Sequence, residues 1–108
     1  MRLGFIGAGN MAQAMIGGIL AKEIVKKEDI IASAATQKTI DKVAKEFGIN
    51  VTLDNREVAK ADIVFLAVKP FYYEEVIDGI KDVVDEKQLI ISVAAGKSVE
   101  WVENAFGG

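Results

Sequence analysis

The sequence predicts an α/β protein with a mainly parallel, doubly wound sheet that carries helices on both faces. Short, nearly continuous apolar runs indicate strands buried on both faces, at residues 3–6, 30–32, 49–53, 63–68 and 89–93. The segments between these runs repeat apolar residues every three or four positions, as amphipathic helices do. Strict alternation of strand and helix favours right-handed crossovers, which bring the ends of all parallel strands to one edge of the sheet.

Each expected helix has its own signals. Asp54 is expected to cap a short helix that runs through Lys60, and Ser98 to cap the last helix. Gly48 is expected to end the helix whose apolar face includes Phe47. Of two adjacent tyrosines, we expect Tyr73 in the core and Tyr72 on the helix surface. The expected apolar helix faces comprise Met11, Met15, Gly18 and Ile19; Ile40, Val43, Ala44 and Phe47; Tyr73, Val76, Ile77, Ile80 and Val84; and Val99, Val102 and Phe106.

Length and composition exclude several classes of protein. The 108 residues fit one domain, and 51% hydrophobic with 27% charged residues are typical of a globular chain. A net charge of -3 without basic clusters argues against nucleic-acid binding. With no cysteine, no histidine and no acidic residues at the spacing of a metal site, no thiolate chemistry and no metal are expected. Neither a signal pattern nor a membrane-spanning run is visible, which predicts a cytoplasmic protein.

A glycine-rich segment, GFIGAGNMAQAM, begins in the first expected strand and opens the first expected helix. Gly7, Gly9 and Ala12 form the pattern G-x-G-x-x-A. In this pattern the first glycine permits a tight turn, the second lets a pyrophosphate approach the backbone, and the alanine allows close packing of helix on strand. The helix start adds free N–H groups and a positive dipole end. The segment therefore predicts a Rossmann-type dinucleotide site; the alternative is a turn that serves packing only.

The residues after the second expected strand bear on which dinucleotide is bound. A site selective for NAD usually places Asp or Glu there, about 20 residues beyond the glycines. Asp29 has the spacing but precedes the strand, and the strand runs out into SAATQK without a carboxylate. A 2'-phosphate is tolerated here and Lys38 can attract it, so NADP is favoured over NAD. The alternative is that Lys38 is a solvated residue in the first turn of a helix.

Several segments together resemble the N-terminal domain of pyrroline-5-carboxylate reductase: GFIGAGNMAQAMIGGIL, the SAA after the second strand, DIVFLAVKP at residues 62–70 and ISVAAGKS at residues 91–98. The first of these is shared with other NADP-dependent proteins, whereas A-V-K-P followed by S-V-A-A-G is more specific. The resemblance covers essentially all 108 residues. It implies reduction of 1-pyrroline-5-carboxylate to proline, the last step of proline biosynthesis, with hydride from NADPH or NADH.

The resemblance also implies which residues contact the cofactor. Around the pyrophosphate it places Ile6, Gly7, Ala8, Gly9, Asn10 and Met11. Near the adenosine ribose it places Ser33, Ala34 and Thr36, with Asn55 as a further contact. On the nicotinamide side it places Ala67, Val68, Lys69 and Pro70, with Ala94, Ala95 and Gly96. The family often has a second serine where this chain has Ala34, and this departure bears on the preference for NADP.

No catalytic residue is assigned from the sequence. Lys69 is the one candidate for a direct chemical role, and the alternative is a solvated charge or structural tether at the exit of a strand. In the resembling family a helical C-terminal domain holds most of the substrate and makes the dimer, and this sequence stops at residue 108 before it. We therefore expect residues 1–108 to be the NADP-binding domain, inactive alone and part of a homo-oligomer when full-length.

Two other functions remain open on the sequence. One is another NADP-dependent oxidoreductase of similar build, such as a relative of the hydroxyacid dehydrogenases or a deazaflavin-dependent NADP reductase. The other is a dinucleotide-binding or sensory module without catalysis. The first would differ in the sequence that follows the dinucleotide-binding domain. The second would show cofactor affinity in this chain without any downstream substrate domain.

Overall fold

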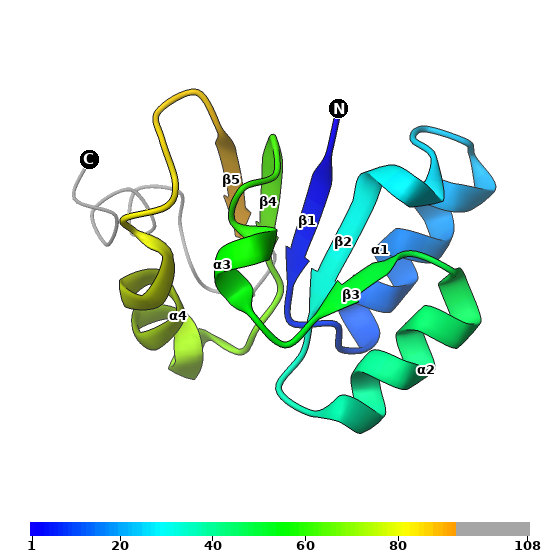
Figure 1. The fold of residues 1–108 in the computed structure, drawn as a ribbon, viewed down its shortest axis with the longest axis horizontal. Helices are drawn as coiled ribbons and strands as arrows, with labels where there is room; N and C mark the ends of the chain where they lie inside the picture. The colour runs from blue at the N-terminus through cyan, green and yellow to red at the C-terminus, as the bar shows by residue number, and fades with distance from the viewer. Residues whose placement is uncertain (93–108) are drawn as a thin grey trace.

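A computed structural model describes residues 1–92, which form a parallel sheet between two layers of helices (Figure 1). The strand order is β3-β2-β1-β4-β5, and each neighbouring pair is parallel. The predicted doubly wound sheet is thereby confirmed. The strands are β1 (Leu3–Ile6), β2 (Ile30–Ser33), β3 (Asn50–Thr52), β4 (Ile63–Leu66) and β5 (Leu89–Ser92). The expected helix with Val99, Val102 and Phe106 and the expected contacts Ala94, Ala95 and Gly96 lie outside the described residues.

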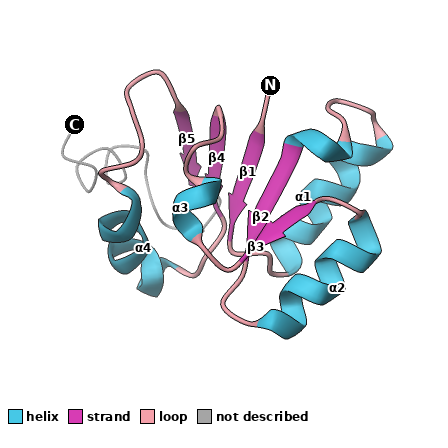
Figure 2. Ribbon diagram, in the orientation of Figure 1, coloured by secondary structure: helices cyan, strands magenta, loops and turns pink. Residues whose placement is uncertain are grey.

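The helices cover both faces of the sheet, with α1 and α2 on one side and α3 and α4 on the other (Figure 2). Their bounds are α1 (Asn10–Ala21), α2 (Gln37–Phe47), α3 (Asn55–Val58) and α4 (Tyr73–Ile80). The order of the strands reverses beside β1, because β2 and β3 lie on one side of it and β4 lies on the other. The chain leaves β1 and β4 toward opposite faces, which opens a crevice at their carboxyl ends.

Alternation along the strands divides the apolar residues between two cores. Leu3 and Phe5 of β1 pack with α1 and α2, whereas Ile6 packs with α3 and α4. Phe5 is paired in register with Phe65 of β4, and their rings stack with centroids 4.6 Å apart. The period of two therefore determines, for every strand residue, which helical layer it meets.

Three helix boundaries follow from local chemistry. The hydroxyl of Thr36 accepts from the Thr39 amide at 3.4 Å and caps α2. Gly48, with φ of 69°, ends α2 in the left-handed conformation, as the sequence predicted. The carboxylate of Asp54 accepts from the Arg56 amide at 2.9 Å, which confirms the predicted cap. The helix that Asp54 caps is shorter than expected, because α3 ends at Val58.

Other details of the sequence prediction also differ from the structure. The buried face of α1 is centred on Ala12 and Ile16, while the side chain of Met11 is 54% exposed. In addition, β4 ends at Leu66, two residues before the expected end at residue 68. The Leu66 carbonyl accepts a hydrogen bond at 3.0 Å from the hydroxyl of Tyr73, which is fully buried as expected. The Ala67 amide still donates to the Ile6 carbonyl at 2.9 Å, so the chain leaves the sheet only after Ala67.

Gly4 offers a test of how tightly α3 packs on the sheet. A Cβ at Gly4 would lie 2.7 Å from the backbone oxygen of Val58, which cannot move without displacing α3. We expect Gly4→Ala to lower the free energy of unfolding by about 1–3 kcal/mol, measured by urea denaturation. The matched control is Gly18→Ala in α1, where a Cβ meets nothing within 4 Å. It should raise the free energy of unfolding by up to about 1 kcal/mol. Equal effects of the two variants would contradict the packing described.

Candidate functional site

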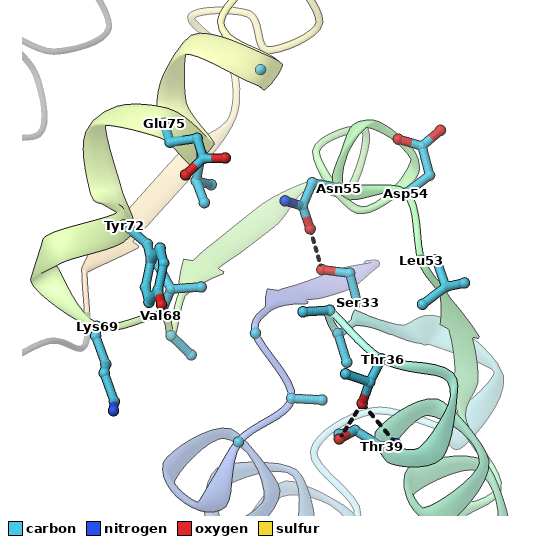
Figure 3. A pocket seen from close by; sticks show the side chains of 18 of the residues that line it. Ser33, Thr36, Thr39, Leu53, Asp54, Asn55, Val68, Lys69, Tyr72 and Glu75 are labelled. Carbon is cyan, nitrogen blue, oxygen red and sulfur yellow. Dashed lines mark hydrogen bonds between the residues drawn. The ribbon is translucent and has the colours of Figure 1, made fainter.

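A cleft of about 760 Å³ opens at the carboxyl ends of β1, β2 and β4 and continues between α3 and α4 (Figure 3). It brings together most of the residues that the sequence singled out: Gly7, Ala8, Gly9, Ser33, Ala34, Thr36, Asn55, Ala67, Val68 and Lys69. Ile6 is instead fully buried in the core. Asn10 and Met11 begin α1 with exposed side chains and are not among the lining residues.

The turn after β1 is tied to the end of β2. The amides of Gly7 and Ala8 both donate to the main-chain carbonyl of Ser33, at 3.1 and 2.8 Å. Gly7 adopts φ of 96°, and a Cβ there would lie 2.7 Å from Cγ1 of Val68. A side chain is therefore excluded at Gly7 by both the backbone conformation and the adjoining loop.

The start of α1 supplies the free hydrogen-bond donors. Gly9 is the N-cap and gives no side-chain cap, so the amides of the first turn lack intrahelical partners. A Cβ at Gly9 would meet nothing within 4 Å, so this residue leaves the approach to those amides open. Since the amides of Gly7 and Ala8 already bond Ser33, the first turn of α1 is the place where a phosphate fits.

The end of β2 carries hydroxyls and no carboxylate. Ser33 is fully buried, and its Oγ donates to Oδ1 of Asn55 at 2.5 Å. Asp29 lies in the turn Lys27–Asp29 before β2, at the opposite end of the strand, as the sequence indicated. Lys38 is exposed in the first turn of α2 and is not among the residues lining the cleft. The position that an NAD-selective site gives to an acid is thus occupied by Ser33 and its neighbours.

The sequence reasoning missed the wall that α4 gives to the cleft. Tyr72, Glu75, Val76 and Gly79 line it, and the first of these is 46% exposed, as expected. They recur at intervals of three and four residues, which places them on one face of a helix. This spacing could have identified the wall, because the helix follows directly from a strand that ends at the cleft. Leu53, 55% exposed after β3, also lines it.

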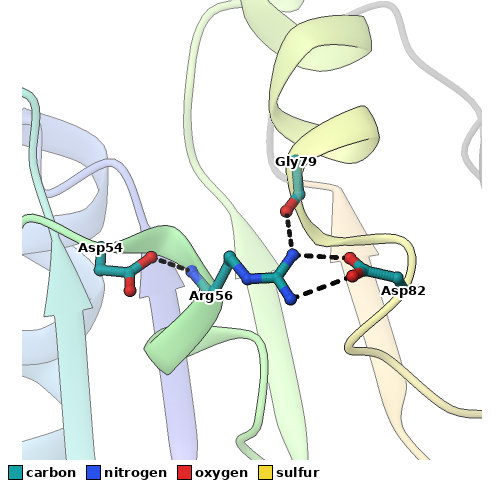
Figure 4. Close-up of polar contacts among 4 residues, drawn as sticks. All are labelled: Asp54, Arg56, Gly79 and Asp82. Atoms are coloured by element: carbon teal, nitrogen blue, oxygen red, sulfur yellow. Dashed lines mark hydrogen bonds and ion pairs between the residues drawn. The ribbon is translucent and has the colours of Figure 1, made fainter.

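An ion pair joins α3 to the residues just beyond α4. The guanidinium of Arg56 donates to both carboxylate oxygens of Asp82, at 2.7 and 3.0 Å, and to the Gly79 carbonyl at 3.0 Å (Figure 4). These hydrogen bonds raise the pKa of Arg56 and lower the pKa of Asp82. Because Arg56 and Gly79 both line the cleft, the pair connects its two walls. No local pattern reveals this contact, since the partners are 26 residues apart.

Two further observations concern residues 1–92. Within this range no three acidic residues gather where a metal ion could be held. None of the helices described there has the length and apolar composition that crossing a bilayer requires. The cleft is therefore built from backbone amides, hydroxyls, an amide side chain and apolar surface, which suit an organic ligand bearing phosphates.

Comparison with known proteins agrees with this geometry. The chain belongs to the family described as "NADP oxidoreductase coenzyme F420-dependent", which matches residues 2–96. More particularly, it is similar to the N-terminal NAD(P)-binding domain of pyrroline-5-carboxylate reductase. It is 35% identical to the enzyme of Escherichia coli (strain K12) over 107 residues, which make up 98% of this chain and 40% of that protein. The chain thus spans about 40% of the length of the curated relatives it matches.

The solved structures that share the fold of this chain include two of these reductases. A pyrroline-5-carboxylate reductase from Coxiella burnetii has a TM-score of 0.91 and 34% identity, over 98% of this chain and 40% of that one. The Plasmodium falciparum reductase, solved with NADP bound, has a TM-score of 0.83 and 30% identity over 98% of this chain and 38% of its own. A prephenate dehydrogenase from A. aeolicus, at 19% identity over 99% of this chain and 39% of its own, shares the fold with a TM-score of 0.84.

The pair between Arg56 and Asp82 predicts an acid dependence of stability. The pKa of Asp82 in the folded chain is below its ordinary value of 3.8, so the ion pair contributes its full stabilisation above that pH. It is lost as the pH falls through the lowered value. Denaturation between pH 5 and pH 2 should therefore show a steeper loss of stability in the wild type than in Asp82→Asn. High salt should reduce the difference, because both groups are exposed. Parallel curves would contradict the assignment.

Proposed function

We propose that this chain is the cofactor-binding part of an enzyme that reduces 1-pyrroline-5-carboxylate to L-proline with NADPH. The observation that carries the proposal is the 35% identity to a pyrroline-5-carboxylate reductase over 98% of the chain. The geometry of the cleft supports it, because the open approach at Gly9 and the uncapped start of α1 suit a pyrophosphate. Reduction adds a hydride to carbon and a proton to nitrogen of the C=N bond, and NADPH becomes NADP⁺.

The role of this chain in the reaction is to bind and orient the dinucleotide. When bound, the nicotinamide supplies the hydride. The first-turn amides of α1 hold the phosphates, and the end of β2 with Asn55 faces the adenosine ribose. Ala67, Val68 and Lys69 line the cleft after β4 and support the nicotinamide side. Holding the ring in one position against the substrate lowers the entropic part of the barrier to hydride transfer.

NADP is the preferred cofactor in this proposal. The end of β2 has no carboxylate to accept a ribose hydroxyl or repel a 2'-phosphate. A similar structure, the Plasmodium falciparum reductase, is solved with NADP bound. The complete enzyme is proposed to be a cytoplasmic homo-oligomer that acts on a small molecule.

A second candidate comes from the family match over residues 2–96, whose description names coenzyme F420. In that case the same cleft binds NADP, and hydride is exchanged between NADP and a deazaflavin instead of being given to an imine. The two candidates share the cofactor and differ in the second reactant. A module that binds a dinucleotide without catalysis would show turnover with neither.

Gly9→Val tests the phosphate site. A side chain at Gly9 points into open space, so we expect the free energy of unfolding to change by less than about 0.5 kcal/mol. The side chain should block the amides of α1 and weaken NADPH binding by at least about tenfold, as expected when charge-assisted hydrogen bonds are lost. Fluorescence titration of the reduced nicotinamide measures the affinity, with Gly18→Ala as the control. Unchanged affinity in Gly9→Val would rule out the pyrophosphate position.

The reaction is tested by exchange of domains. The chain replaces the matching 40% of the Escherichia coli reductase, and oxidation of NADPH is followed with pyrroline-5-carboxylate and with oxidised coenzyme F420. We expect turnover of the imine by the chimera. The 108-residue chain should bind NADPH by itself but show little or no turnover. A chimera that binds NADPH but does not reduce the imine, together with reduction of the deazaflavin by the chain, would favour the second candidate. Rapid turnover of the imine by the chain alone would refute the proposed division of labour.

A further inference from the structure

Phe71 is the most exposed large apolar side chain in residues 1–92, with 87% of its surface accessible. It lies in the turn Pro70–Tyr72, which joins β4 to α4 at the carboxyl edge of the sheet. The Tyr72 amide donates to the Lys69 carbonyl at 2.8 Å, and this bond closes a four-residue turn with Phe71 in its third position. The exposed ring is therefore carried by a hydrogen-bonded backbone.

Phe71 is not an isolated apolar residue on the surface. Its ring meets the ring of Tyr72 edge to face, with the centroids 5.2 Å apart and the planes at 86°. Tyr72 is itself 46% exposed, so the two rings form one open aromatic patch. Single exposed apolar residues need no explanation, whereas grouped aromatic side chains are typical of the centre of a protein–protein contact.

Two charges of opposite sign flank this aromatic patch. Lys69 precedes it and Glu75 follows it in the first turn of α4, and both side chains are exposed. Figure 3 shows Lys69 and Glu75 on opposite sides of Tyr72. The ion pairs found within residues 1–92 include neither of them. The surface thus has an apolar centre, a positive end and a negative end.

A surface of this kind is complementary to itself. In an isologous pair the two copies are related by a twofold rotation, so the positive end of one copy faces the negative end of the other. With the aromatic patches at the axis, Lys69 of each copy meets Glu75 of the other. Each charge then gains a partner that its own chain does not provide, and the potentials of the two surfaces match. A second copy of this chain is therefore the partner that these residues fit.

We propose that two copies of this chain associate through the surface formed by Lys69, Phe71, Tyr72 and Glu75. Two rings from each copy form a contact smaller than the roughly 1,200–2,000 Å² of a stable interface, so the dissociation constant is expected to be on the order of 100 μM. The inference goes beyond the proposed function and does not depend on which dinucleotide is bound. Because Lys69, Tyr72 and Glu75 also line the cleft, association is measured without dinucleotide.

Sedimentation equilibrium of the 108-residue chain tests the apolar centre. Phe71→Ser should weaken association at least about tenfold, because the ring then no longer leaves water on contact. Its urea unfolding should match that of the wild type, since the ring is exposed. The control is Ile24→Ser, which removes a side chain that is 63% exposed between α1 and β2, at the opposite edge of the sheet. It should change the dissociation constant by less than about twofold.

Reversal of the charges tests the twofold arrangement independently of Phe71. Lys69→Glu and Glu75→Lys each set like charges against one another, and each should weaken self-association at least about fivefold at low salt. Mixed in equal amounts, the two variants should associate with each other, because every contact between them again joins opposite charges. A chain that carries both substitutions should associate as the wild type does. The control Glu86→Lys makes the same change of net charge at an exposed residue before β5 and should have little effect.

Each contrary result identifies a different error. A wild-type chain that is monomeric at about 1 mM would overturn the proposal, as would equal effects of Phe71→Ser and Ile24→Ser. Failure of the two charge variants to associate with each other, beside a dimeric wild type, would place the contact elsewhere on the chain. A monomeric wild type together with a Phe71→Ser chimera that melts earlier than its parent would overturn it in favour of a contact with the rest of the longer protein.

Discussion

Two hydrogen bonds on one carbonyl oxygen hold the cleft in its shape. The main-chain oxygen of Ser33 accepts from the amides of Gly7 and Ala8, so the chain leaving β1 must turn sharply at the end of β2. That turn requires the positive φ of Gly7 and places α1 with its uncapped amides at the crevice. Without these bonds, neither the direction of α1 nor the close approach of Val68 to Gly7 would be fixed.

Ser33 connects the parts of the site through both its backbone and its side chain. The carbonyl bonds the loop that precedes α1 on one face, while the hydroxyl reaches Asn55 at the start of α3 on the other. The loop before α1 and the start of α3 are therefore linked by a single strand terminus. Next to Asn55 in α3, Arg56 pairs with Asp82 and ties α3 to the chain beyond α4, so the walls are braced at two places.

The fold was largely predictable from the sequence, because apolar periodicity and glycine positions are local properties. Gly7, Gly9 and Gly48 could be assigned to turns and helix ends in this way. The exact face of α1 was not, since Met11 and Ile16 are both apolar and only packing shows which is buried. The contacts of Ser33 with Asn55 and of Arg56 with Asp82 depend on which elements the topology brings together, and sequence spacing carries no information about that.

The register of β2 against β1 determines which face of the sheet the Ser33 side chain occupies. Ser33 meets Asn55 because its register partner is Ile6, on the same face of the sheet. If one residue were deleted within β2, the strand would slip and its side chains would exchange faces. An alanine would then stand where the serine does now. Such a deletion would remove the hydrogen bond between Ser33 and Asn55 without any substitution in the glycine loop.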